Sequence, residues 1–323
     1  MGASAMSRWL PTALKQKLRA LPQWSAIALR EPQAAVEVRM FAAGGNFDVT
    51  RNSVVAALRP LTLAVGLGEQ IISTMKEGSE PALHFVDLES RHTLGVLHLR
   101  QIRDPSLAAS QIGLFEIRHG AQYCVRWPYR PWNRWLQNRA MRKHSDPNNF
   151  SMPPAAVQQL MIFYIRPRPV VLVSVDDGHH SNIFPMDLIG HIAPDYFTLA
   201  LRSTSQSIAT MKTARRVALS SIAAQDRAIA YQLGAHHKNV QVEWDRLPFR
   251  IQRSNNYALP CPETALGIRE LDILSFESIG SHTFFITRIA SERSFRDSPQ
   301  LCHTSGIHQY FRSRNGGVLQ LAP

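Results

Sequence analysis

The chain has few cysteines and no long apolar run. Its three cysteines, Cys124, Cys261 and Cys302, are far apart in the 323 residues and form no CxxC pair. Neither a disulfide framework nor a zinc site is therefore expected. No run of about 18 apolar residues is present, and the N-terminal segment lacks the apolar core of a signal peptide. These absences favour a cytoplasmic protein that does not enter a membrane.

The glycine motifs that bind nucleotides are also missing. Gly44-Gly45 and Gly66-Leu67-Gly68 each lack a third glycine at the spacing of a GxGxxG fingerprint, and no Walker loop or nucleophile elbow occurs. A Rossmann dehydrogenase is therefore disfavoured. His236 and His237 are adjacent, so their side chains point apart, and no acidic or cysteine partner has ligand spacing. We expect both histidines to be structural and no metal to be bound.

Acidic residues are scarce in the first half. Residues 1–150 contain 19 Lys and Arg against 11 Asp and Glu, and the whole chain has a net charge of +12. Such a charge attracts anions in general, including nucleic acid, membrane surfaces and phosphorylated cofactors, without choosing among them. No acidic residue precedes Glu31, which predicts an ordinary basic first helix, with a transit peptide or an amphipathic surface helix as alternatives.

The composition predicts a globular protein with two domains. Apolar residues make up 45% of the chain and charged residues 19%, which is typical of folded proteins, and the length suits two ordinary domains. Residues 144–155 are rich in Pro, Asn and Ser and have no periodicity, so they form the predicted linker. The boundary is placed near Phe150, which gives domains of 1–150 and 151–323.

The first 120 residues predict mainly β structure. Short β-branched segments recur between turn residues, and Pro60 marks a bend between two apolar halves. The predicted strands are Ala35–Phe41, Ser53–Leu67, Ala82–Asp87, His92–Ile102 and Ile112–Ile117.

Aromatic residues interleave with arginines in residues 123–143. Trp132 and Trp135 are three apart on a predicted short helix, so packing on a core or a partner subunit is the favoured interpretation. A cover over a bound cofactor is the second alternative. Nucleic-acid binding is the third and is unlikely, although stacked aromatics among arginines suit bases and phosphates.

The second half predicts a β-rich core with a few helices. A helix is predicted over Thr204–Ala214 with Ser203 or Thr204 as its N-cap, and a second over Ala224–Leu233 that Gly234 ends. Hydroxyl side chains crowd the first turn of the earlier helix, which suits a phosphate site. The remaining predicted elements are strands at 168–175, 196–202 and 216–222, another strand that leads to 182–186, and a hairpin over 271–291.

Ordered segments between residues 160 and 315 resemble the flavin reductase-like family with the FMN-binding split-barrel fold. They read RPRPVVLVSVDDG, SNIFPMDLIGHIAPD, LALRSTSQSIATMK, VALSSI, GAHHKN and GSHTFFITRI. The resemblance implies a mainly β, α+β chain whose C-terminal split barrel binds FMN, or FAD, at a homodimer interface. It also implies hydride transfer from NADH or NADPH to the flavin, with reduced flavin passing in some members to a separate monooxygenase.

The resemblance assigns flavin contacts to two segments. The loop from Asn182 to Leu188, with Met186 and Asp187 as the contacting pair, would approach the isoalloxazine ring. The second segment would hold the ribityl phosphate. Its residues are Arg202, Ser203, Thr204, Ser205, Ser207 and Lys212.

His282 is the candidate catalytic residue. It stands in Gly280-Ser281-His282-Thr283, where the family commonly has Gly-Asp-His, a motif associated with nicotinamide or flavin contact. Ser281 replaces the carboxylate that would orient the imidazole, so a non-catalytic flavin-binding or redox-partner module is the alternative function. The flavin itself carries the redox chemistry, and the protein binds and orients the reactants.

The fold of residues 1–150 is left open by the resemblance. Several strands there, and the likeness of LRPLTLAVGLG to RPRPVVLVSV, allow a degenerate second barrel packed on the first. In that arrangement residues 127–135 would line an intramolecular version of the dimer interface.

Overall fold

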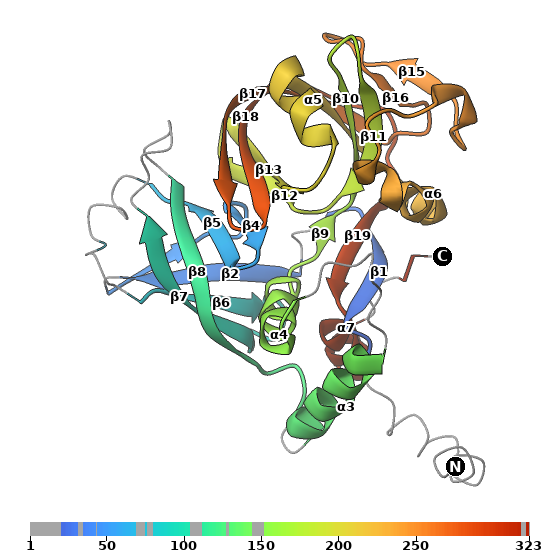
Figure 1. Ribbon diagram of the computed structural model, residues 1–323. Coiled ribbons are helices and arrows are strands. Elements are labelled where there is room, and N and C mark those ends of the chain that lie inside the picture. The colour runs from blue at the N-terminus through green and yellow to red at the C-terminus, as the bar shows by residue number, and fades with distance from the viewer. Residues whose placement is uncertain are drawn as a thin grey trace, which may run out of the picture.

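The computed structural model shows a mainly β chain with a few helices, as predicted (Figure 1). It describes residues 21–31, 35–42, 44–68, 75, 80–103, 112–126, 129–143, 152–317 and 321–322. The predicted basic first helix, Trp127 and the predicted boundary at Phe150 lie outside this set.

The first half folds into a curled antiparallel sheet of seven strands, here called the N-terminal barrel. Its strand order is β3-β2-β6-β7-β8-β5-β4. Valine, leucine and phenylalanine side chains on the concave face form its buried core. The strands are β2 (Val36–Ala42), β3 (Gly45–Asp48), β4 (Ser53–Leu58), β5 (Leu61–Gly66), β6 (Ala82–Asp87), β7 (Thr93–Arg103) and β8 (Ile112–Gln122).

The second half forms another seven-stranded antiparallel sheet, the C-terminal barrel, with order β11-β10-β14-β17-β18-β13-β12. Helix α5 (Ser207–Ala214) adds Ile208 and Met211 to its core. The strands are β10 (Val171–Asp176), β11 (Ser181–Met186), β12 (Ile189–Ala193), β13 (Tyr196–Arg202), β14 (Arg216–Ser221), β17 (Gly267–Ile279) and β18 (His282–Ser294).

The two barrels have the same topology. Numbered one to seven along the chain within each barrel, the strands of both sheets follow the order 2-1-5-6-7-4-3. The prediction of a second barrel in the first half is therefore confirmed. The likeness that suggested it paired the wrong strands. LRPLTLAVGLG forms β5, whose counterpart is β13, whereas RPRPVVLVSV forms β9 (Arg168–Pro169) and β10. Apolar strands that follow a proline look alike in sequence, and only their place in the sheet distinguishes them.

The barrels pack against each other through equivalent strands. Strand β4 contacts its own counterpart β12 and also β13 and β18, while β12 contacts β5. A contact between equivalent elements is what a two-fold arrangement of two like units gives. The seam between them is apolar and closely packed, with small residues such as Ala56 and Ala64 from one barrel facing Ile192 and Phe284 from the other.

A third, smaller sheet ties the ends of the chain together. Its order is β1-β19-β9, where β1 is Trp24–Leu29 and β19 is Gln300–Ser305. The N-terminal strand therefore pairs with the C-terminal half. Helix α4 (Pro154–Phe163) in turn contacts β7 and β8 of the N-terminal barrel, so elements cross the predicted boundary in both directions.

Helix α3 (Tyr129–Lys143) is the short helix predicted to carry Trp132 and Trp135, and two of its polar residues bind the backbone of Leu21. Asn133 accepts a hydrogen bond from the Leu21 amide at 2.9 Å, and Gln137 donates to the Leu21 carbonyl at 3.1 Å. Trp132 and Trp135 stack on each other and remain 43% and 48% exposed, so they do not pack in the core.

The last helix, α7 (Gly306–Arg314), closes the N-terminal core with Ile307.

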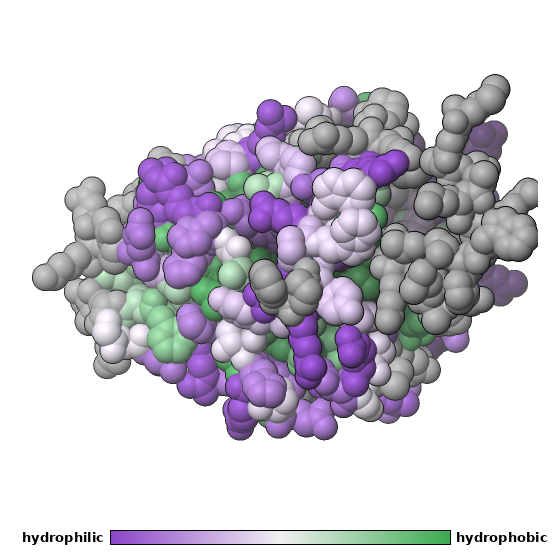
Figure 2. All heavy atoms as spheres, turned by 90° about the horizontal axis from the view of Figure 1, so that it is seen from below, coloured by the Kyte–Doolittle hydropathy of each residue, from purple (hydrophilic) through white to green (hydrophobic). Residues whose placement is uncertain are grey.

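The view from below shows hydrophilic residues over most of the coloured surface, with smaller hydrophobic areas between them (Figure 2).

Two predicted helix boundaries are wrong. Helix α5 begins at Ser207 without a side-chain cap, because Ser205 closes a turn on the Arg202 carbonyl. Gly234 does not end the second helix: α6 (Arg227–Gln232) continues as a 3₁₀ segment, Leu233–Lys238. This extension brings the carbonyls of residues 236–239 against β11 and α5, where side chains bind them.

Candidate functional site

The residues predicted to bind flavin lie at opposite ends of the C-terminal barrel. Met186 pairs with Val171 of β10, which pairs with Ser221 of β14. Ser221 pairs with Gly267 of β17, which in turn pairs with Ser294 of β18, so Met186 lies at the Ser294 end of the sheet. Arg202 pairs with His282 at the other end of β18. The structure therefore separates Met186 from Arg202, whereas Asn182, near the start of β11, contacts Ser207. Residues 182–186 form strand β11 and not the predicted loop.

Asn182 and two of the predicted phosphate hydroxyls form an internal network. The Asn182 amide donates to Ser207 Oγ at 3.0 Å and to the carbonyls of His236 and Asn239, both at 2.8 Å. Ser205 Oγ donates to the His237 carbonyl at 2.7 Å. Asn182 and Ser207 are fully buried, so these groups anchor the 3₁₀ segment on the barrel.

The paired histidines take part in the same anchoring. His236 Nδ1 lies 3.2 Å from the Ile183 carbonyl, and His237 Nδ1 lies 2.8 Å from the Gly234 carbonyl. Burial lowers the pKa of His237, with a smaller effect from Arg202. Both rings contact backbone carbonyls. Among the described residues, no group of three or more His, Cys, Asp or Glu side chains is placed to hold a metal.

Ser203 and Thr204 are the exposed members of the predicted phosphate segment. They follow Arg202, which is partly buried, and burial lowers its pKa. Lys212 lies elsewhere on α5, with its ammonium 4.6 Å from the centre of the Phe276 ring. An anion at this end would therefore meet Arg202 and two hydroxyls.

His282 is buried in the seam between the barrels, with only 1% of its surface exposed. Its Nδ1 lies 2.9 Å from Ser281 Oγ and accepts a long hydrogen bond, 3.5 Å, from the Leu58 amide of the N-terminal barrel. Burial, followed by the charge of Arg202, lowers its pKa to about 4. The imidazole is therefore neutral at physiological pH and is held by both barrels.

Asp187 is the hub of a second polar cluster that the sequence did not reveal. His303 Nδ1 lies 2.8 Å from its carboxylate, and the Tyr164 hydroxyl donates to it at 3.0 Å. The Tyr231 hydroxyl lies 3.2 Å from His303 Nε2, and the Trp24 ring packs edge-on against Tyr164 at 4.4 Å. Residues as far apart in the sequence as Trp24 and His303 meet here, with ring centroids 6.4 Å apart, and β1 and β19 bring them together.

In this cluster the Asp187 carboxylate is held by two hydrogen-bonding partners. Burial acts to raise the pKa of Asp187, but the hydrogen bond and charge of His303 and the hydrogen bond from Tyr164 outweigh it, so the pKa is lowered. A carboxylate on Nδ1 fixes the tautomer and leaves Nε2 directed at Tyr231. Asp187 and His303 are 24% and 22% exposed, so solvent reaches the pair. Such a carboxylate–imidazole pair suits general acid–base chemistry.

No helix in the described part of the chain has the length and apolar character needed to cross a membrane.

Comparisons with known proteins give matches to solved structures alone. No protein-family model matches the sequence, and no curated protein matches it.

The fold is similar to that of an FMN-binding protein from Thermus thermophilus solved with bound 1-cyclohex-2-enone, at 19% identity over 47% of this chain and 80% of that chain (TM-score 0.38). It is also similar to an NADH:FAD oxidoreductase from Streptomyces globisporus C-1027, at 16% identity over 50% and 95% (TM-score 0.41). A third structure is the flavin reductase component of a bacterial two-component tryptophan halogenase, at 17% identity over 46% and 93% (TM-score 0.41). Each of these matches covers about half of this chain and most of the other chain.

Proposed function

We propose that the chain is a flavin reductase that binds FMN or FAD between its two barrels and reduces it with NADH or NADPH. The observation that carries this proposal is the pairing of two barrels of the same strand order through equivalent strands. The sequence resemblance implies a flavin site at the interface of two such barrels. Here one chain supplies both barrels, so the paired unit forms without a homodimer.

Two sets of side chains suit parts of a flavin, and one FMN contacts only one of them because they lie at opposite ends of the C-terminal barrel. At one end Arg202, Ser203 and Thr204 offer a positive charge and two exposed hydroxyls for a phosphate. At the other end Asp187 lies in the segment assigned to the ring and carries the His303 contact. Ser205 and Ser207 are assigned to the phosphate by the resemblance, but they fit it less well because their hydroxyls already make internal hydrogen bonds.

A bound flavin would accept the hydride, and the protein's own residues would bind and orient the reactants. In this proposal the Asp187–His303 pair exchanges protons with solvent next to the ring segment. His282, neutral and buried, acts as a hydrogen-bonding group that joins the barrels near Arg202. The catalytic role assigned to His282 by its motif stays a prediction.

The second candidate is a flavin-binding module without reductase activity. The burial of His282, together with Ser281 in place of the family's aspartate, favours it. Delivery of reduced flavin to a separate monooxygenase belongs to the first candidate only. The two are distinguished by mixing flavin-loaded protein with NADH or NADPH under anaerobic conditions: the reductase loses its visible flavin absorbance, and the binding module keeps it.

A further inference from the structure

A basic hollow of about 360 Å³ lies at the Ser294 end of the C-terminal barrel. Seven arginines line it against two carboxylates. The hollow also reaches the N-terminal barrel through Arg51 and Ser53 and the small sheet through Arg30. Its size is at the lower end of the range for small-molecule sites.

Two arginines in its wall are buried and form no ion pair with any described residue. Arg166 is 6% and Arg168 is 3% exposed. Arg168 donates from Nη1 to the Ser53 carbonyl at 2.8 Å, and its guanidinium lies over the Phe163 ring at 3.9 Å. Among the described residues, Nε of Arg166 and Nε and Nη2 of Arg168 have no hydrogen-bond partner.

Burying unpaired cations beside one another costs free energy. Burial and then the charge of Arg51 lower the pKa of Arg166 to about 10, and burial and then Arg166 lower the pKa of Arg168. Asp48 and Asp187 act in the opposite direction, more weakly. An arginine retains its proton even so, and the charge therefore calls for an anion.

The carboxylates at the rim are already paired. Glu292 binds Arg269, and Asp297 binds Arg30, and both carboxylates are mostly exposed. They therefore offset Arg30 and Arg269. The positive charge of the other five arginines in the lining is left for a ligand: Arg51, Arg166, Arg168, Arg293 and Arg296.

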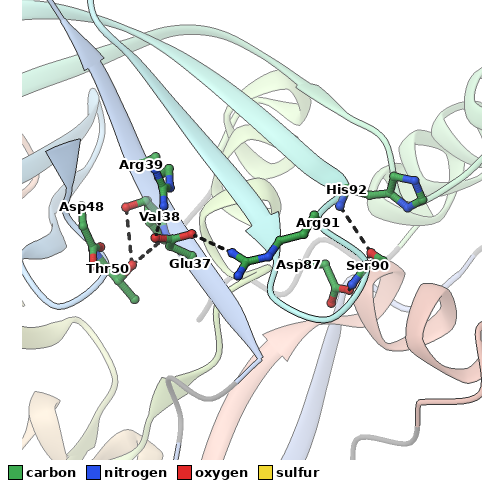
Figure 3. A network of polar contacts seen from close by, with 9 residues as sticks. All are labelled: Glu37, Val38, Arg39, Asp48, Thr50, Asp87, Ser90, Arg91 and His92. Atoms are coloured by element: carbon green, nitrogen blue, oxygen red, sulfur yellow. Dashed lines mark hydrogen bonds and ion pairs between the residues drawn. The ribbon is translucent and has the colours of Figure 1, made fainter. Parts of the chain in front are cut away.

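The rim is held in place by ordered neighbours. In the segment before Arg51 (Figure 3), the Val38 amide donates to Thr50 Oγ1 and the Thr50 amide donates to Asp48 Oδ1, each at 2.8 Å. On the opposite wall the Arg269 guanidinium lies 4.7 Å from the centre of the Phe197 ring, which itself packs edge-on against His191 at 5.0 Å. The lining thus includes an aromatic pair, Phe197 and His191, beside Arg269.

We propose that this hollow binds a multiply charged phosphate group, such as a pyrophosphate or a phosphate monoester, with Arg51 and Arg166 as its main ligands and with the charge of Arg168 beside them. Guanidinium forks bind phosphate oxygens in pairs. Ser53, Ser221 and Ser294 line the same hollow and add hydroxyl or backbone donors. The site is separate from Arg202 and Thr204, at the other end of the barrel, and does not depend on the proposed reductase activity.

The test is titration of the full-length protein with sodium pyrophosphate at constant ionic strength, followed by calorimetry and by melting temperature. We expect saturable binding and a rise in melting temperature. Arg166→Met and Arg51→Met are each expected to weaken binding about tenfold or more. Arg118→Met, an exposed arginine outside the hollow, is the matched control and is expected to bind as the wild type does.

Arg168→Met adds a readout that does not depend on ligand. Because it removes an unpaired buried charge, the variant is expected to melt no lower than the wild type in phosphate-free buffer. If it fails to fold, Arg51→Met and Arg166→Met carry the test. No saturable pyrophosphate binding, or equal weakening in Arg118→Met, overturns the proposal.

Competition identifies the source of the phosphate. If NADH, NADPH or FAD displaces pyrophosphate, and Arg51→Met also weakens the binding of that dinucleotide, the hollow holds the pyrophosphate of the dinucleotide. If none displaces it, the ligand is a separate phosphorylated metabolite. FMN binding by Arg51→Met, measured from flavin absorbance, tests the proposed function separately.

Discussion

Replacing Gly66 with alanine tests the intramolecular pairing of the barrels. Gly66 ends β5 at the seam, and a Cβ atom there would lie 1.6 Å from the Ile192 carbonyl oxygen and 2.7 Å from its carbon. Both atoms belong to the backbone of the other barrel, so no side-chain rotation relieves the clash. The barrels would have to move apart by more than an ångström, which opens an apolar seam.

We expect Gly66→Ala to lower the free energy of unfolding by about 3 kcal/mol, the upper part of the usual cost of overpacking. Gly68→Ala is the matched control, because it lies two residues away with nothing within 4 Å of the added atom. It is expected to change stability by less than about 0.5 kcal/mol. Urea unfolding followed by tryptophan fluorescence measures both. Equal stability of the two variants would refute the packing of Gly66 against Ile192.

Further predictions concern assembly, pH and the exposed aromatics. The paired barrels predict a light-scattering mass near the 36.3 kDa of one chain, whereas the homodimer implied by the resemblance would double it. The pKa of Asp187 is lowered in the folded state, so the ionised carboxylate stabilises the fold at neutral pH. This stabilisation is lost as pH falls through the folded pKa. Asp187→Asn should therefore remove this part of the loss of stability in acid, measured by urea unfolding at a series of pH values. His282 and His308 have pKa values lowered to about 4, mainly by burial. Because the unfolded chain binds a proton at each histidine below about pH 6.5 and the folded chain does not, the free energy of unfolding should fall between about pH 6.5 and 4, by about 3 kcal/mol at most for each. His282→Gln should make this fall smaller in the same measurements. Because Trp132 and Trp135 are exposed, replacing both with alanine should change the free energy of unfolding by less than about 1 kcal/mol. A larger loss would show that they are packed.

Much of the fold could be predicted from periodicity. The strands from Val36 to Gln122 and the hairpin of β17 and β18 match alternating or apolar runs bounded by turn residues. The shared strand order could only be suspected, because the two barrels have little sequence in common beyond short pieces such as Thr62–Val65 and Thr198–Leu201. Sheet order depends on long-range pairing, which a local pattern does not encode.

The candidate site was less accessible from sequence. Asp187 was predicted from its motif, but its partners Tyr164, Tyr231 and His303 lie in distant segments with no shared spacing. Ser205 and Ser207 looked like phosphate ligands because hydroxyls favour helix starts, yet they bind the 3₁₀ segment that follows α6. Arg166 and Arg168 lie in RPRP, at the start of a predicted strand, where the sequence does not indicate burial. Only the fold shows that both are buried and form no ion pair with a described residue.

The most direct test of the proposed function is the absorbance spectrum of the purified full-length protein. It is recorded with FMN or FAD and again after NADH or NADPH is added without oxygen. The proposal predicts a flavin spectrum that stays with the protein through gel filtration and is bleached by at least one of the two nicotinamides. Failure to retain either flavin, or a retained flavin that neither nicotinamide bleaches, would contradict it.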